Sequence, residues 1–290
     1  MTSIGIDSEK CSMTMASGLP TTENTGRHSI SEPFWPGVKE TVLCIGCQSS
    51  EALHCRDVTD MNYYGSPDHM ASLQDYEKRV FSHCDFSKPS DEYGLGGEYL
   101  IRCYSAADDS ELTRKPYRDL NTGLVSRLYH KNELLYEWKF TGASPRKASI
   151  IHHANGRTYL LYFEDLYGYS VLDLSSMQSV HYIPQESHET DKSRFEETVI
   201  WAVSHYDPES SLLAVEGCLW AYPYTVLVVD FSDPMQIVEA RQWLDLNGDI
   251  DSGHYDEISF IGWDEDSLVC DTGRFNKSDL FTRIKELQLS

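Results

Sequence analysis

The sequence predicts an all-β protein of repeated antiparallel sheets, preceded by a disordered N-terminal tail. The main observation is a β unit that occurs twice, in residues 152–175 and 203–232. Each copy has the pattern of a strand, a polar turn, an apolar strand and a second apolar strand that ends in Val-x-Asp-(Leu/Phe)-Ser. A degraded third copy begins at residue 258. The aromatic content of 12 %, with 18 Tyr and 6 Trp, also favours strands, because flat, stiff side chains pack well on a pleated surface.

The length and charge of the chain limit the classes of partner. The chain has 290 residues, enough to bury a sizeable core, and its net charge is −22, from 46 acidic and 24 basic residues. A negative field of this size opposes binding to nucleic acids and to anionic membrane surfaces, so we expect neither as a partner. A solvated acidic surface is the simplest interpretation of the charge, and a cationic partner is the alternative.

The sequence also indicates a compartment. It contains no run of 18 apolar residues, and residues 1–30 lack the basic start and apolar core of a secretory signal. We therefore expect a cytoplasmic protein. Its eight cysteines are spread along the chain, and in a reducing compartment we expect them to stay as free thiols.

The pattern divides the chain into a disordered tail at residues 1–33 and a single β-repeat domain at residues 34–290. The tail is rich in Ser, Thr and Gly and poor in large apolar residues. Within the domain, the strand and turn pattern predicts four units, at residues 92–142, 146–184, 196–244 and 256–288. The last segment, residues 281–289, fits either a final strand or a C-terminal helical turn.

Over residues 98–288 this repeated pattern resembles that of β-propeller repeat proteins. The resemblance implies small antiparallel sheets arranged around an axis, each packed on its neighbours. It is a likeness to an architecture and not to a specific family, because Trp263-Asp264 falls in a turn and not at the strand end where tryptophan–aspartate repeats carry that pair. A β-sandwich or an irregular set of sheets is the alternative.

Two segments have partial metal-binding patterns. Cys44 and Cys47, with later His-Cys pairs, offer zinc ligands, but residues three apart on a strand point to opposite faces. Residues 245–251 resemble a calcium loop, yet Ile250 occupies the position where the sharp turn needs Gly, and the flanking sequence predicts strands instead of helices. We therefore expect no metal and no cofactor, and both segments stay open as alternatives.

The sequence contains none of the common catalytic motifs, such as Gly-x-Ser-x-Gly, His-Glu-x-x-His or a phosphate-binding loop. We therefore expect a non-enzymatic binding or scaffold protein. The alternative is a carboxylate-dependent hydrolase with a central pocket, since carboxylates lie near aromatic residues in several places. With 46 acidic residues such neighbours occur by chance, and no pair is singled out.

Two loops are unusually aromatic for turns, which are normally rich in Gly, Asn and Asp. They join equivalent strands of the two repeat copies, so a rotation that relates the copies places both loops on one side of the domain. We expect them to form a binding face for a protein partner or for a small polar or cationic ligand. If their side chains are buried, the loops are instead plugs against a neighbouring sheet. The predicted site residues are Trp220, Tyr222 and Tyr224 in one loop and Glu164, Asp165, Tyr167 and Tyr169 in the other.

Overall fold

The structure, a computed structural model, describes residues 59–64, 74, 78–107, 122–141, 147–188, 193, 195–220, 222–249 and 257–289. All of them belong to the second of the two units into which the chain divides, Glu51–Ser290. The tail predicted at residues 1–33 lies outside the described residues. The single domain predicted for residues 34–290 stays a prediction.

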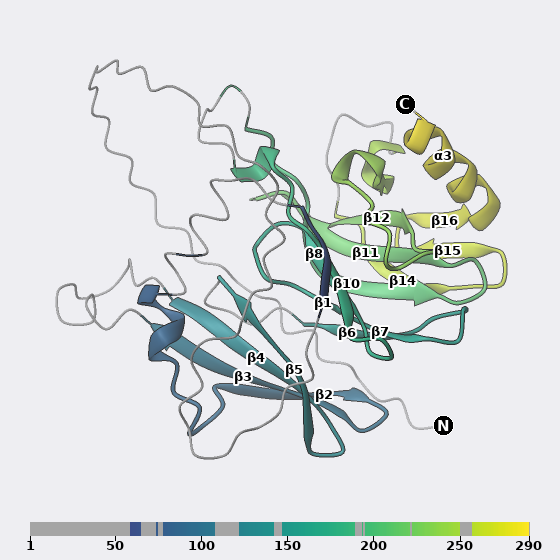
Figure 1. Cartoon of the computed structure of the whole chain (residues 1–290). Helices are drawn as coiled ribbons and strands as arrows, with labels where there is room; N and C mark the ends of the chain where they lie inside the picture. Colours follow the sequence, from purple (N-terminus) through teal and green to yellow (C-terminus); the bar gives the residue numbers. More distant parts are fainter. Residues whose placement is uncertain are drawn as a thin grey trace, which may run out of the picture. The chain divides into compact units, whose positions relative to one another are not determined.

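The all-β fold class is confirmed, because the described residues form four small sheets (Figure 1). The first sheet is antiparallel throughout and has the order β2 (Asp91–Gly96), β3 (Tyr99–Ala107), β4 (Thr122–His130), β5 (Glu133–Phe140). Its β4–β5 turn places Lys131 and Asn132 at positive φ angles of 52° and 69°. Such a two-residue turn matches the twist of the strands that it joins.

The second sheet has four antiparallel strands, which are β6 (Ser149–His152), β7 (Thr158–Tyr162), β8 (Tyr169–Asp173) and β9 (Gln178–Tyr182). A fifth strand, β1 (Thr59–Tyr64), pairs in parallel with β9 at the outer edge. This one pair departs from the expected antiparallel pattern. The reason is that β1 comes from a distant part of the chain and not from a hairpin, which would impose antiparallel pairing.

The third sheet has the order β10 (Ile200–Asp207), β11 (Leu212–Cys218), β12 (Thr225–Asp230), β13 (Leu244–Asp245). The fourth contains β14 (Phe260–Trp263), β15 (Ser267–Cys270) and β16 (Gly273–Asn276). The chain then forms α3 (Lys277–Leu289), so the closing segment is a helix and not a strand. No helix of the described residues is long and apolar enough to cross a membrane. Short 3-10 helices lie in the connections, at η1 (Phe81–His83), η2 (Glu186–His188), η3 (Ala240–Gln242) and η4 (Leu246–Asp249).

The sheets pack face to face in chain order, through three main clusters of buried side chains. In β8, Leu172 belongs to the cluster shared with the first sheet, whereas Val171 belongs to the cluster shared with the third sheet. In β12, Val229 packs toward the second sheet, and Val228 packs toward the fourth sheet and α3. Alternate residues of a strand point to opposite faces, so a strand between two neighbours must be apolar on both. Every residue of β8 and β12 is accordingly buried.

The two repeat copies have equivalent environments in the structure. Asp173 and Asp230 each end the third strand of their sheet, and each accepts a hydrogen bond from the backbone N–H two residues later, at 2.8 Å from Ser175 and 3.0 Å from Ser232. Each also pairs with a cation, Asp173 with Arg157 and Asp230 with Lys285. The repeated Val-x-Asp-(Leu/Phe)-Ser motif is therefore an apolar strand followed by a carboxylate that orders the next turn.

Candidate functional site

The predicted binding residues lie in the loops that join the second and third strands of the second and third sheets. In the third sheet, the loop at residues 219–224 exposes its aromatic side chains to solvent. Trp220 and Tyr222 are each 52 % exposed, and Tyr224 is 40 % exposed. Trp and Tyr side chains are enriched among the residues that carry most of the binding energy at protein interfaces.

Both loops approach the same carboxylate, Glu197, in the segment that leads into β10. The Trp220 backbone N–H donates a hydrogen bond to Glu197 Oε1. On the other loop, burial and the negative charges of Glu197 and Asp165 raise the pKa of Tyr167. Glu197 therefore bonds to one loop and influences the ionisation of a side chain in the other. The role of both loops in binding stays a prediction.

Asp165 is buried and holds the loop of the second sheet in place. Its Oδ2 accepts a hydrogen bond from the Thr141 hydroxyl at 2.8 Å, and its Oδ1 accepts one from the Tyr167 backbone N–H at 3.3 Å. Thr141 N–H in turn donates to the Glu164 carbonyl. The Asp165 carboxylate is therefore occupied in fixing the loop to the end of β5, and it is not presented to a partner.

Glu164 also points inward. Its Oε2 lies 2.6 Å from His181 Nδ1 and 3.1 Å from the Ser170 hydroxyl, and His181 Nε2 lies 2.9 Å from the Ser179 hydroxyl. The sequence of hydroxyl, imidazole and carboxylate resembles that of a catalytic triad. Ser179 is fully buried, however, so a substrate cannot reach it in this structure. The network satisfies polar groups between the first and second sheets.

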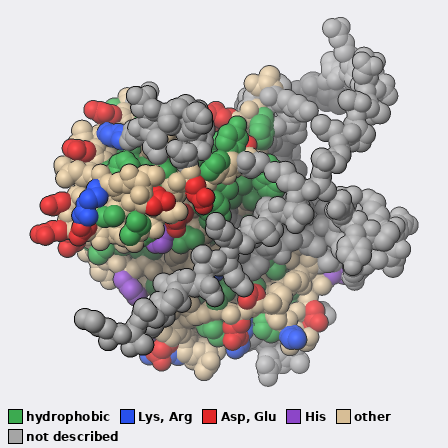
Figure 2. Space-filling model, turned by 180° about the vertical axis from the view of Figure 1, so that it is seen from behind, with side chains coloured by type: hydrophobic (Ala, Val, Ile, Leu, Met, Phe, Trp, Pro, Cys, Tyr) green, Lys and Arg blue, Asp and Glu red, His purple; other side chains and the backbone are tan. Residues whose placement is uncertain are grey.

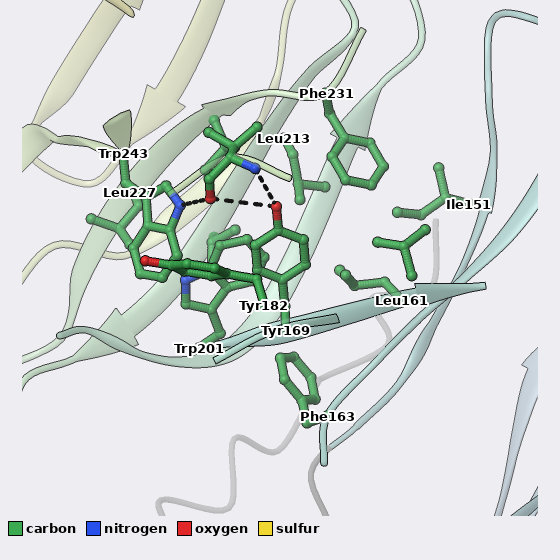
Figure 3. Close-up of a cluster of buried hydrophobic side chains, with 14 of the residues drawn as sticks. Ile151, Leu161, Phe163, Tyr169, Tyr182, Trp201, Leu213, Leu227, Phe231 and Trp243 are labelled. Atoms are coloured by element: carbon green, nitrogen blue, oxygen red, sulfur yellow. Dashed lines mark hydrogen bonds between the residues drawn. The ribbon is translucent and has the colours of Figure 1, made fainter. Parts of the chain in front are cut away.

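Tyr169 belongs to the core and not to the exposed face (Figure 3). Its ring stacks on Trp201 with the centroids 4.6 Å apart, and its hydroxyl accepts a hydrogen bond from the Val238 backbone N–H at 2.9 Å. Trp243 donates its indole N–H to the Val238 carbonyl in the same cluster. These aromatic side chains form the support beneath the loops.

A pocket of about 320 Å³ lies beside the exposed aromatic loop. Leu219, which precedes Trp220, forms part of its wall together with Val199 and Leu227, and Tyr182 and Trp243 add aromatic surface. Five acidic residues line the pocket, namely Glu186, Glu196, Glu197, Glu239 and Asp245. Two of their carboxylates also accept hydrogen bonds, that of Glu197 from the Trp220 backbone N–H and that of Asp245 from the Thr225 hydroxyl. The one basic side chain among its lining residues is Arg241, whose Nε lies 3.1 Å from Glu239 Oε2. The pocket therefore carries an excess of negative charge next to apolar surface.

Acidic side chains also lie among hydrophobic ones on the face shown in Figure 2. The pocket differs from that face in being concave. Negative charges in a concave site reinforce one another, because low-dielectric walls focus their field. Such a site attracts cations more strongly than a flat acidic surface does.

Where the structure describes the partial metal-binding patterns, their side chains make ordinary structural contacts. Asp245 Oδ1 accepts a hydrogen bond from the Asn247 backbone N–H at 2.9 Å, and residues 246–249 form η4. Burial raises the pKa of the Cys84 and Cys270 thiols to about 11, so both stay protonated at neutral pH. No group of three or more His, Cys, Asp or Glu side chains in the described part of the chain could hold a metal ion. Cys44, Cys47 and residues 250–251 of the calcium-like loop lie outside that part.

Comparison of the chain with protein-family models, with curated proteins and with solved structures found no match. Function must therefore be inferred from the geometry. Sequence reasoning located the aromatic loop and missed the acidic lining of the pocket, which comes from four separate segments. The one local signal was the adjacent pair Glu196-Glu197 just before a strand.

Proposed function

We propose that this protein is a non-enzymatic binding or scaffold protein that recognises its partner through an aromatic–acidic face. The face consists of the exposed side chains of Trp220, Tyr222 and Tyr224 and the adjacent acidic pocket. The observation that carries the proposal is the position of the three exposed aromatic side chains next to a concave site with five carboxylates and one basic side chain.

Physical chemistry favours a partner with positive charge. Trp and Tyr supply large contact areas at little conformational cost, and they attract cations through the faces of their rings. Carboxylates disfavour anionic ligands and steer cationic ones toward the site. A protein partner or a small cationic ligand fits both features, and a nucleic acid fits neither.

The proposal extends to the architecture and the compartment. Four successive small sheets, packed face to face, are consistent with a propeller-like arrangement. In such an arrangement the loops that join equivalent strands lie on one side, which is the normal position of a binding face. A cytoplasmic location agrees with the acidic, cysteine-containing sequence.

The proposal is tested by affinity capture from the native organism with the full chain and its Trp220→Ala variant, followed by mass spectrometry and measurement of the dissociation constant. We expect Trp220→Ala to weaken binding by about 2 kcal/mol, roughly 30-fold, as substitutions at interface hot spots do. The melting temperature should stay nearly unchanged, because the side chain is 52 % exposed. The matched control is Ile261→Ala, which removes an exposed apolar side chain from β14.

Two results would contradict the proposal. One is a loss of several kcal/mol of stability in Trp220→Ala, which would make the loop part of the core. The other is turnover of a glycan or ester panel without capture of a protein partner, which would favour the hydrolase alternative.

In the described residues, every carboxyl group with a resolved pKa shift has its pKa lowered, as at Asp173, Asp207 and Glu216, whereas a catalytic acid needs a raised pKa.

A further inference from the structure

The pocket beside the aromatic loop has a lining of two chemical kinds. Apolar and aromatic surface comes from Val199, Leu219, Leu227, Tyr182 and Trp243, and negative charge comes from the five carboxylates. We infer that the ligand of this pocket is a single arginine or lysine side chain of a protein partner, a conclusion that rests on the proposed binding function. These side chains have an apolar stem and a charged head, so one molecule satisfies both kinds of lining.

The arrangement of the carboxylates argues against a metal ion as the occupant. A divalent ion needs several oxygen ligands within about 2.6 Å of one point. In the described part of the chain no three His, Cys, Asp or Glu side chains converge in this way. The volume of about 320 Å³ is also far larger than a bare ion and lies at the lower end of ligand pockets. Dispersed carboxylates instead suit a guanidinium or ammonium group, which donates several hydrogen bonds in different directions.

The aromatic loop argues for a protein segment and against a small free cation. Leu219 lines the pocket, and the next residue, Trp220, is held there by the hydrogen bond from its backbone N–H to Glu197. Trp220 therefore follows the pocket wall in the chain, and the Tyr222 backbone N–H donates a hydrogen bond to the Leu219 carbonyl at 3.0 Å. Both aromatic side chains are 52 % exposed. A small cation inside the pocket would leave them uncovered. Residues that flank an arginine or lysine in a polypeptide would cover them and gain hot-spot contacts.

Arg241 is the basic residue already present in the lining of the pocket. Its guanidinium pairs with Glu239 at 3.1 Å, yet its side chain is 74 % exposed, so this contact is weak and easily replaced. Among the described lining residues, five are acidic and Arg241 is the one basic residue. An incoming cation therefore adds charge neutralisation without having to displace a buried ion pair.

The test is a titration of the full chain with pentapeptides, monitored by the indole N–H signals of Trp220 and Trp243 in nuclear magnetic resonance spectra. The peptides carry a central arginine or lysine between two phenylalanine residues. The matched peptide carries citrulline, which has the shape of arginine without its charge. We expect the arginine and lysine peptides to shift both signals, and the citrulline peptide to bind at least about ten-fold more weakly.

Substitution of acidic residues tests which carboxylates bind the basic side chain of the peptide. The double variant Glu196→Gln/Glu239→Gln should weaken binding of the arginine peptide at least about five-fold, whereas Glu265→Gln, on an exposed turn of the fourth sheet, should leave it unchanged. Equal binding of the citrulline peptide, or no effect of the double variant, would overturn the inference. Equally tight binding of N-acetyl-lysine amide would overturn the protein-segment part of it.

The two proposals fail in different ways. If Trp220→Ala weakens capture of the partner while the double variant does not, the binding face stands and the basic-side-chain inference is wrong. If capture is insensitive to Trp220→Ala, the proposed function itself is wrong. The peptide titration gives its answer in either case.

Discussion

Chemically similar residues in the two aromatic loops have opposite environments. Tyr169 is 2 % exposed and stacks on Trp201, whereas Tyr224 is 40 % exposed. The difference comes from strand position. Tyr169 is the first residue of β8 and faces the cluster shared with the third sheet, but Tyr224 precedes β12 and lies at the end of its sheet. Tyr169 is therefore part of the core, whereas Tyr224 presents part of its side chain to solvent.

Replacement of Tyr169 by Phe should destabilise the protein. The variant keeps the ring and removes the hydroxyl that accepts the Val238 N–H at 2.9 Å, so a buried donor loses its partner. We expect a loss of about 1–3 kcal/mol in the free energy of unfolding, measured by urea denaturation. Tyr224→Phe is the control, with a smaller expected loss, because the side chain is 40 % exposed and water can solvate groups that lose a contact there. Equal losses in the two variants would show that the hydroxyl of Tyr169 has no special role.

At the scale of elements, the loop at residues 163–168 returns to β8 through Gly168. This residue has a φ angle of +81°, and a Cβ atom added there would lie 2.0 Å from the Tyr182 carbonyl oxygen. The close approach brings β8 against β9 and fixes where the loop leaves the sheet. Any residue other than glycine at this position would therefore have a strained backbone, and its Cβ atom would collide with the Tyr182 carbonyl oxygen.

The structure contains a matched test of these two effects. Gly156 has nearly the same φ angle, +80°, but a Cβ atom there has no neighbour within 4 Å. Gly156→Ala should therefore cost only the backbone strain, about 1–2 kcal/mol. Gly168→Ala should cost at least ~2 kcal/mol more, because the collision with backbone must also be relieved. Thermal and urea unfolding of both variants measure the difference, and equal costs would contradict the close packing of β8 on β9.

At the scale of the whole described unit, each sheet depends on its neighbours. Successive sheets share their apolar faces, so removal of one sheet would expose a face of the next. Polar contacts also cross the boundaries. Glu216 joins the third and fourth sheets, since its Oε1 accepts the Phe260 backbone N–H at 3.0 Å and its Oε2 lies 3.1 Å from His205 Nε2. Its removal should loosen the contact between two sheets.

The contribution of Glu216 should depend on pH. The hydrogen bond with His205, and after it the one from Phe260, lowers the pKa of Glu216 below its usual value of 4.5. A carboxyl group whose pKa is lower in the folded state stabilises the fold above the unfolded pKa and loses this effect as pH falls through the folded pKa. We therefore compare the unfolding free energies of the unsubstituted protein and of Glu216→Gln at several pH values. Their difference should be constant between about pH 5 and pH 6, and it should decrease as the pH falls below about 4.5. Glu265→Gln is the control, and a difference independent of pH would contradict the linkage.

The sequence by itself determined the class of the fold and much of its order. Runs of apolar residues and the turn residues that follow them act over a few neighbouring positions, so they specify strands and turns locally, as in the Val-x-Asp motifs of β8 and β12. The same local signals located the exposed loop with Trp220. They did not specify the parallel partner of β9 or the helix at the end of the chain.

Only the tertiary structure decided which residues of the candidate site are exposed and which are buried. Glu164, Asp165 and Tyr169 are used inside the protein, whereas Glu197 and Glu239, from segments outside both loops, line the pocket. A one-residue change in strand position reverses the direction of a side chain, and the pocket exists because stacked sheets bring distant connections together. Side-chain direction and long-range proximity depend on packing between sheets, and for that reason no local pattern in the sequence could determine them.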